Sequence, residues 1–228
     1  PIAFDHGLWD SVVPLLTPHR HIVRFDLRGH GATEVTQEPY AVEVLAEDAL
    51  ALASALGLDE FDFVGTSLGG LIGLQVAAIA PVRVRSLVVA NASARLPLPT
   101  DEWNRRIGLA ASSGVEPFVG GLLERMFSPA YREAGSPTLH TLIASFRAMN
   151  QHGYAAAMAA LRDADMREQL RLVRTRTLVI AGEADGAVPH DHSKYMADSI
   201  ASGGRLVVLP GGHLSAVESP AVFAHARS

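Results

Sequence analysis

The sequence predicts an α/β fold in which a mostly parallel β-sheet is flanked by helices, with a helical segment inserted between two strands. Short runs rich in Val, Ile, Leu and Phe alternate with longer segments whose apolar residues recur at helical spacing. These runs are continuously apolar, which is typical of parallel strands buried on both faces. The alternation stops over 98–173, where helix-like segments follow one another without a convincing strand.

The elements can be assigned in order from these patterns. The strand-like runs are 1–4, 22–25, 61–64, 87–90, 177–181 and 205–209. The helix-like segments between them are 40–56, 71–80, 191–200 and one beginning near Pro220. Gly57 is placed as a helix C-cap, and Pro81 closes the helix that precedes it. Within the insertion, helical spacing covers 102–111, 115–126, 137–149 and 154–163.

These elements predict one α/β core made of residues 1–97 and 174–228, with residues 98–173 as a helical lid. A block inserted between parallel strands usually lies over their carboxyl ends, where ligands bind. Loops and lids over that edge commonly set specificity. The alternative is that the insertion is only an additional packing layer.

Composition excludes several classes of function. The 228 residues include no cysteine, which excludes a thiol nucleophile, a disulfide framework and a Cys-ligated metal. A net charge of −5 gives no electrostatic reason to expect nucleic acid or an anionic membrane as a partner. Lys194 is the only lysine, so a Schiff-base mechanism is disfavoured. Without a membrane-span candidate or a signal peptide, we expect a cytoplasmic protein.

The pentapeptide Gly65-Thr66-Ser67-Leu68-Gly69 is the most specific motif in the chain. It follows a predicted strand and opens a predicted helix, and G-x-S-x-G in that setting is typical of a nucleophilic serine on a sharp turn. Small residues are needed where strand and helix come close, and Gly65, Gly69, Gly70 and Gly73 are placed to supply them. The motif predicts Ser67 as a nucleophile.

A serine nucleophile needs a base and an acid that orients the base. In doubly wound hydrolases these follow in the order acid, then histidine, on loops after later strands. Asp185 follows the run 177–181, and His213 follows the run 205–209 between glycines and Leu214. We therefore predict a triad of Ser67, Asp185 and His213.

Other candidates for the acid and base are weaker. Glu183 lies too near the strand end, and Asp191 is placed in the first turn of the next helix. His190 and His192 can line the pocket or lie on the surface, and His30 is expected to brace its loop. The histidines lack the helical spacing of a zinc site with an intervening Glu, so we expect no metal, and no cofactor is implied.

The oxyanion of acyl transfer requires backbone donors, and the N–H of Leu68 is expected to be one of them. A second donor should come from the loop after the first strand, yet Phe4 is followed at once by Asp5. We hypothesise that residues are missing between Phe4 and Asp5, since a true deletion would leave half an oxyanion hole.

The chain resembles the α/β-hydrolase superfamily and, more narrowly, the 3-oxoadipate enol-lactonases of bacterial aromatic degradation. The similar stretches include 25–32, 50–58, 65–73 and 91–95, of which many superfamily members share 25–32 and 65–73. More specific are Trp103 and the lid stretches 124–131 and 160–167. There are two departures: Met126 stands where many members have an aromatic residue, and the loop after the first strand is missing.

The resemblance implies a small carboxylated enol-lactone as substrate, hydrolysed to a keto acid, with Ser67, Asp185 and His213 in the catalytic roles. Arginine suits a carboxylate partner. The arginines over the predicted pocket are Arg95, Arg105, Arg106, Arg147 and Arg162. None of them can be singled out from the sequence, and the oligomeric state stays open.

Two alternatives remain beside a lactonase. One is a general carboxylesterase or a cofactor-free perhydrolase on the same scaffold, because one fold supports many chemistries. The other is a non-catalytic ligand receptor with a hydrolase fold, which an intact Ser, Asp and His set disfavours. A haloalkane dehalogenase is disfavoured because its nucleophile would be Asp, and position 67 is Ser.

Overall fold

The computed structural model describes residues 1–37 and 40–226, and its sheet has four parallel strands in the order β1-β2-β3-β4. The strands are β1 (Phe61–Thr66), β2 (Val84–Ala90), β3 (Arg176–Gly182) and β4 (Gly204–Leu209). Thr66 pairs with Ala90, and Ala90 pairs with Ile180. The carboxyl ends of the strands therefore lie along one edge, which is where open α/β sheets bind ligands.

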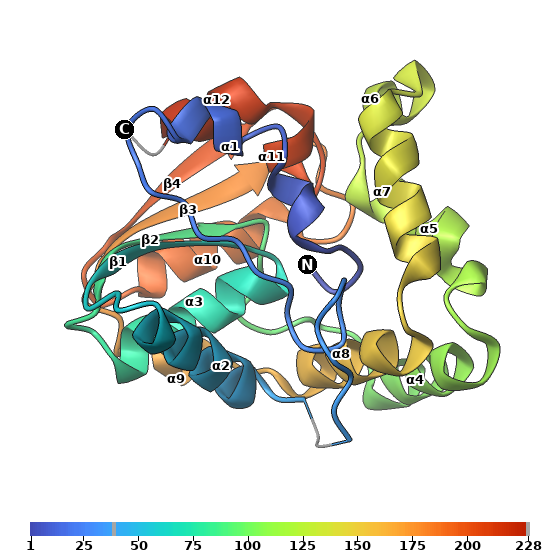
Figure 1. The fold of residues 1–228 in the computed structure, drawn as a ribbon, viewed down its shortest axis with the longest axis horizontal. Helices are drawn as coiled ribbons and strands as arrows, with labels where there is room; N and C mark the ends of the chain where they lie inside the picture. Colours follow the sequence, from blue (N-terminus) through green and yellow to red (C-terminus); the bar gives the residue numbers. More distant parts are fainter. Residues whose placement is uncertain (38–39, 227–228) are drawn as a thin grey trace.

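Helices cover both faces of the sheet (Figure 1). On one face lie α2 (Val42–Ala55), α3 (Leu68–Ile79), α9 (Arg167–Leu170) and α10 (His190–Ser199). On the other lie α1 (Val13–Leu16), α11 (Ser215–Glu218) and α12 (Pro220–Ala226), with the 3-10 helix η1 (His6–Trp9) beside α11. Gly57 takes a φ of 68° just past the end of α2, which confirms it as the residue that ends this helix.

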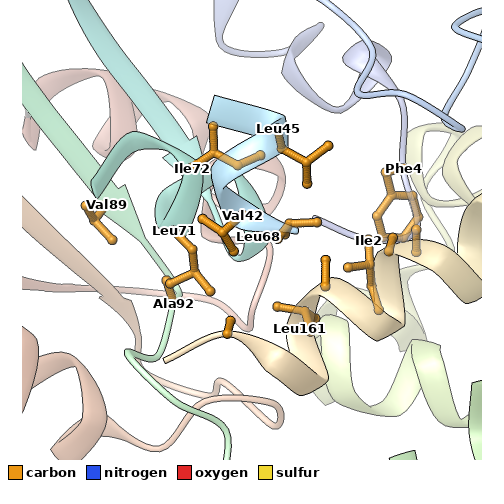
Figure 2. Packing of buried hydrophobic residues seen from close by; sticks show 14 of the residues in the cluster. Ile2, Phe4, Val42, Leu45, Leu68, Leu71, Ile72, Val89, Ala92 and Leu161 are labelled. Atoms are coloured by element: carbon orange, nitrogen blue, oxygen red, sulfur yellow. The ribbon is translucent and has the colours of Figure 1, made fainter. Parts of the chain in front are cut away.

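Alternate residues of the central strands enter two separate apolar clusters. Val89 and Val179 belong to a large cluster with α3, whereas Val88 and Ile180 pack with Phe223 of α12. Figure 2 shows the large cluster, with Leu71 and Ile72 of α3 between α2 and Val89 of β2. Burial on both faces explains why these strands read as continuous apolar runs, and it confirms that prediction.

The strands predicted at 1–4 and 22–25 are wrong, because neither segment is a strand in the structure. A cavity of about 550 Å³ lies between residues 22–27 and β1, and it is lined by residues of 22–27 and of β1. A strand is defined by its ladder of hydrogen bonds to a neighbour. The apolar character of 22–25 is therefore used to line a cavity beside the sheet edge, and β1 stays an edge strand.

Between β2 and β3 the described chain contains helices and no strand. They are α4 (Thr100–Ser113), η2 (Glu116–Phe118), α5 (Val119–Met126), α6 (Pro129–Ala134), α7 (Pro137–Ala148), α8 (Gln151–Asp163) and α9. Those from α4 to α8 stand to the right of the sheet in Figure 1. The predicted helices of this region are confirmed within a few residues, while α6 and α9 were missed. Over residues 1–37 and 40–226, no helix combines the length and apolarity needed to cross a membrane.

Candidate active site

Ser67 lies on a strained turn between β1 and α3. Its φ of 55° and ψ of −121° fall outside the regions that side-chain-bearing residues normally occupy. The Ser67 amide donates to the carbonyl of Ala90 over 2.8 Å, so the turn is anchored to the neighbouring strand. Backbone strain of this kind persists only where the surrounding structure enforces it, and it concentrates at functional sites.

The turn is possible because Gly65 has no side chain. A Cβ at Gly65 would lie 2.0 Å from the carbonyl oxygen of Gly69, which is backbone and cannot move aside. Gly73 is also required, because its Cβ would lie 2.8 Å from side-chain atoms of Phe63 and Leu87. The expectation is wrong for Gly69, whose Cβ would meet nothing within 4 Å.

Asp185 and His213 form a buried hydrogen-bonded pair after β3 and β4. His213 Nδ1 lies 3.0 Å from Asp185 Oδ2 and 3.1 Å from Oδ1. The side chain of His213 is only 2% exposed, and that of Asp185 only 1%. The amides of Ala187 and Val188 also donate to Oδ1, at 2.8 and 2.9 Å. The structure thus brings the predicted acid and the predicted histidine within hydrogen-bond reach of each other.

The surroundings of Asp185 keep it ionised despite its burial. Burial alone would raise the pKa of this carboxyl, but the hydrogen bond and charge of His213, the Val188 amide and the Asn91 side chain together lower it below its ordinary value. A carboxylate facing Nδ1 favours the tautomer that carries its proton on Nδ1. His213 Nε2 is then left as an acceptor, which is the state a general base requires.

Ser67 follows β1, whereas Asp185 and His213 follow β3 and β4, so β2 lies between them in the sheet and the structure does not join them by a hydrogen bond. Within the described residues, no hydrogen bond connects the Ser67 hydroxyl to the His213 ring. Catalytic contacts are often long in unliganded enzymes and tighten when substrate binds. The assignment of Ser67 as nucleophile therefore stays a prediction.

The other predicted candidates have structural contacts. Glu183 is exposed, and Asp191 lies in the first turn of α10 as expected. His190 Nε2 lies 2.9 Å from the Gly182 carbonyl, and His192 Nδ1 lies 2.7 Å from Ser93 Oγ. Buried His30 contacts the Arg28 carbonyl over 3.1 Å through Nδ1, which confirms that it braces its loop.

Sequence reasoning missed Glu218, whose carboxylate fastens the His213 loop to the inserted helices. Its Oε1 accepts from the amides of Gly212 and Ser128, each at 3.0 Å. Its Oε2 accepts from the Ser128 hydroxyl at 2.5 Å. The Leu214 amide also donates to the carbonyl of Met126. The loop that carries His213 is thus held from the insertion, which no local sequence pattern indicates.

The amide of Leu68 is placed at the first position of α3, where helix geometry provides no intrahelical acceptor. In the described part of the chain, it donates to no protein group. It is therefore available to an anion bound beside Ser67, as an oxyanion-hole donor must be. This agrees with the predicted role but does not test it.

Three amides of the loop expected to hold the second donor already donate within the protein. The backbone runs from Phe4 into Asp5 with ordinary dihedral angles at Asp5 (φ −86°, ψ −173°). The hypothesis of missing residues between Phe4 and Asp5 stays a prediction. The amides that follow are committed elsewhere: His6 donates to Asp26, and Gly7 and Leu8 donate to Asp5. Any of these three amides could serve as the second oxyanion-hole donor only if its present hydrogen bond were broken.

Asp5, His6 and Asp26 bring ligand-type atoms within 4.8 Å of one another, a group that the sequence spacing did not predict. Their polar atoms already serve the protein. Asp26 accepts from His6 Nδ1 and from the Ala32 amide, and Asp5 accepts from Gly7 and Ser145. The group is thus explained as a hydrogen-bonded corner between the η1 turn and the 26–32 loop.

The arginines considered as carboxylate partners are already paired. Arg95 contacts Asp165, both Arg105 and Arg106 contact Glu102, Arg147 contacts Glu116, and Arg162 contacts Asp163. Arg125, which the sequence did not single out, is half-buried near the end of α5. Among the described residues, no carboxylate forms an ion pair with it. Burial first and then the charge of Arg106 lower its pKa, so an anion placed there would be favoured.

Comparison with known proteins agrees with this architecture. A family model described as alpha/beta hydrolase fold matches residues 3–220. The chain is 32% identical over 222 residues to 3-oxoadipate enol-lactonase 1 of Acinetobacter baylyi, covering 97% of this chain and 82% of that one. It is 30% identical over 226 residues to a putative carbamate hydrolase, RutD, of Rhizobium rhizogenes, covering 94% and 84%.

A solved structure is similar over the whole of this chain. The enol-lactonase from Burkholderia xenovorans LB400 matches with a TM-score of 0.95 at 30% identity, covering 100% of this chain and 86% of that one. Such agreement extends over the sheet, the Ser67 turn and the inserted helices together. The chain therefore belongs to the alpha/beta hydrolase fold family and is an ester or lactone hydrolase related to the 3-oxoadipate enol-lactonases.

Proposed function

We propose that this protein is a serine hydrolase that opens a small carboxylated enol-lactone, of the 3-oxoadipate enol-lactone type, through an acyl-enzyme on Ser67. The observation that carries the proposal is the buried Asp185–His213 pair, which lies at the same edge of the sheet as the strained Ser67 turn. The names of the relatives and of the solved enol-lactonase support the substrate class.

The chemistry follows from the positions of these groups. His213 Nε2 takes the hydroxyl proton as Ser67 Oγ attacks the lactone carbonyl. The resulting oxyanion is stabilised by the Leu68 amide, and such a donor typically contributes about 3 kcal/mol. The ring oxygen then leaves as an enol that accepts the proton from His213, and the enol becomes the ketone. Water, deprotonated by His213, attacks the acyl-enzyme and releases the keto acid with Ser67 restored.

The carboxylate of the substrate needs a cation near this chemistry, and Arg125 is the arginine we propose. The Arg125 Cα lies close to Gly186, the residue after Asp185. A Cβ added at Gly186 would lie only 3.2 Å from the Arg125 Cα. Met126, the next residue of α5, accepts from the amide of Leu214 beside His213. Arg125 thus belongs to the part of the insertion that touches both the acid loop and the histidine loop.

The substrate class is tested by comparing kcat/KM for 3-oxoadipate enol-lactone with that for short-chain p-nitrophenyl esters and a simple neutral lactone. We expect the carboxylated enol-lactone to be preferred by at least about tenfold, because a charge-assisted hydrogen bond contributes roughly 1.5–3 kcal/mol. A preference for the simple esters would favour a general carboxylesterase. A carbamate should be included, since one relative is named as a putative carbamate hydrolase.

Arg125→Gln is expected to lower the ratio of kcat/KM for the carboxylated over the neutral lactone by roughly 10- to 100-fold, because the charge of the guanidinium is lost while a polar side chain remains. The matched control is Arg147→Gln, since Arg147 is exposed and paired with Glu116 on the insertion. Steady-state kinetics on both substrates give the ratio. Equal ratios in wild type and Arg125→Gln would remove Arg125 from substrate recognition.

A further inference from the structure

Asn91 is fully buried just past the carboxyl end of β2, and its side chain contacts the loops that carry Asp185 and His213. Its backbone has a φ of 50°, in the left-handed region that asparagine tolerates better than most residues. The backbone N–H of Asn91 donates to the Ile180 carbonyl of β3 over 2.7 Å. The residue is thus fixed at the strand edge between the predicted nucleophile on one side and the acid on the other.

The side chain of Asn91 is bonded at both ends. Its Nδ2 donates to Asp185 Oδ2 over 3.0 Å and approaches the Gly212 carbonyl at 3.4 Å. Its Oδ1 accepts from the hydroxyl of fully buried Ser215 over 2.7 Å. This division of donor and acceptor defines which way the amide points, because only the NH₂ end can donate to a carboxylate.

The two oxygens of Asp185 are held differently. Among residues 1–37 and 40–226, Oδ1 accepts from the backbone amides of Ala187 and Val188, whereas Oδ2 accepts only from Asn91 Nδ2 besides the His213 ring. The Asn91 side chain is therefore the group that holds Asp185 Oδ2 in its orientation toward the His213 ring. Ser215 in turn fixes the Asn91 amide, and both contacts are shielded from water.

We propose that Asn91, oriented by Ser215, is a positioning residue that sets the direction and basicity of the Asp185 carboxylate toward His213. This inference rests on the proposed function, because it matters only if Asp185 and His213 support Ser67. A donor on Oδ2 withdraws charge from the carboxylate. Without this donor, the Asp185 carboxylate attracts the protonated His213 ring more strongly.

The test uses Asn91→Gly, which removes the side chain while keeping the positive φ accessible. With p-nitrophenyl acetate as substrate, we expect kcat to fall roughly 10- to 100-fold with little change in KM, as for other losses of alignment. The acid limb of the kcat/KM profile should move up by roughly half a pH unit or more. Ser215→Ala should change both quantities in the same direction by less.

Ser93→Ala is the matched control, because Ser93 is a buried serine of the same loop that contacts Arg95 and His192 but not Asp185. Its kcat and pH profile should stay near those of wild type. If Asn91→Gly keeps the pH profile of wild type, the proposal is overturned even when kcat is reduced. A purely structural role of Asn91 would lower activity without moving the acid limb of the kcat/KM profile. If Asn91→Gly does not fold, the Ser215→Ala profile decides in the same way.

The failure of this inference differs from the failure of the proposed function. Persistent turnover in Ser67→Ala would remove the acyl-enzyme mechanism altogether. If turnover depends on Ser67 but Asn91→Gly and Ser215→Ala keep wild-type kcat and pH profiles, the positioning role alone is rejected.

Discussion

Replacing Ser67 with alanine is expected to reduce kcat/KM on p-nitrophenyl acetate by on the order of 10⁴-fold or more, because the remaining groups can stabilise charge but cannot form the acyl-enzyme. The substitution removes one oxygen atom at a partly exposed turn, so stability should change little. Steady-state kinetics measure the loss, and thermal unfolding checks that the variant is folded.

The covalent step has a separate measurement. A fluorophosphonate ester that phosphylates active serines should add its mass once to the wild-type protein and not to Ser67→Ala. The control is Ser112→Ala, because Ser112 lies on the exposed face of α4. Full turnover in Ser67→Ala, or labelling of that variant at another serine, would contradict the mechanism proposed here.

Gly65→Ala is expected to destabilise the protein by about 3 kcal/mol or more, because the added methyl group would have to displace backbone and not a flexible side chain. The new Cβ would lie 2.0 Å from the Gly69 oxygen and 2.7 Å from the Gly70 nitrogen. Either α3 shifts away from β1 or the turn opens. Activity should fall with stability, since Ser67 lies inside the distorted turn. Urea unfolding followed by circular dichroism measures the change.

The same motif offers the matched control. Gly69→Ala places a methyl group in open space near the start of α3, where alanine is the better helix former. We expect its free energy of unfolding to stay within about 1 kcal/mol of wild type. If Gly65→Ala were as stable as Gly69→Ala, the close approach of strand and helix would not be what requires glycine.

Much of the site was predictable because its residues follow strands. Periodicity locates β1, β3 and β4, and parallel strands necessarily bring their carboxyl ends to one edge. The order of Ser67, Asp185 and His213 along the chain then specifies which side chains meet, and the hydrogen bond between Asp185 and His213 agrees with that prediction. The approach of Ser67 to His213 depends on side-chain rotation, which strand order does not determine.

Other features could not be predicted because they depend on contacts between distant segments. Asn91 and Ser215 are 124 residues apart, and Glu218 reaches Ser128 across 90 residues. Neither pair has a local sequence pattern. Arg125 was missed for a related reason: ion pairing distinguishes it from the other arginines, and pairing is known only once the chain is folded.

The α/β class, the turn at Ser67 and the loops after β3 and β4 could be predicted, because local propensity and strand order depend on short segments. Three features became visible only in the folded chain: 22–25 lies across a cavity from β1, amides after Phe4 are already bonded, and Asn91 donates to Asp185. Those outcomes depend on which segments pack together. Packing is a sum of weak interactions over the whole chain, and no single stretch of residues encodes it.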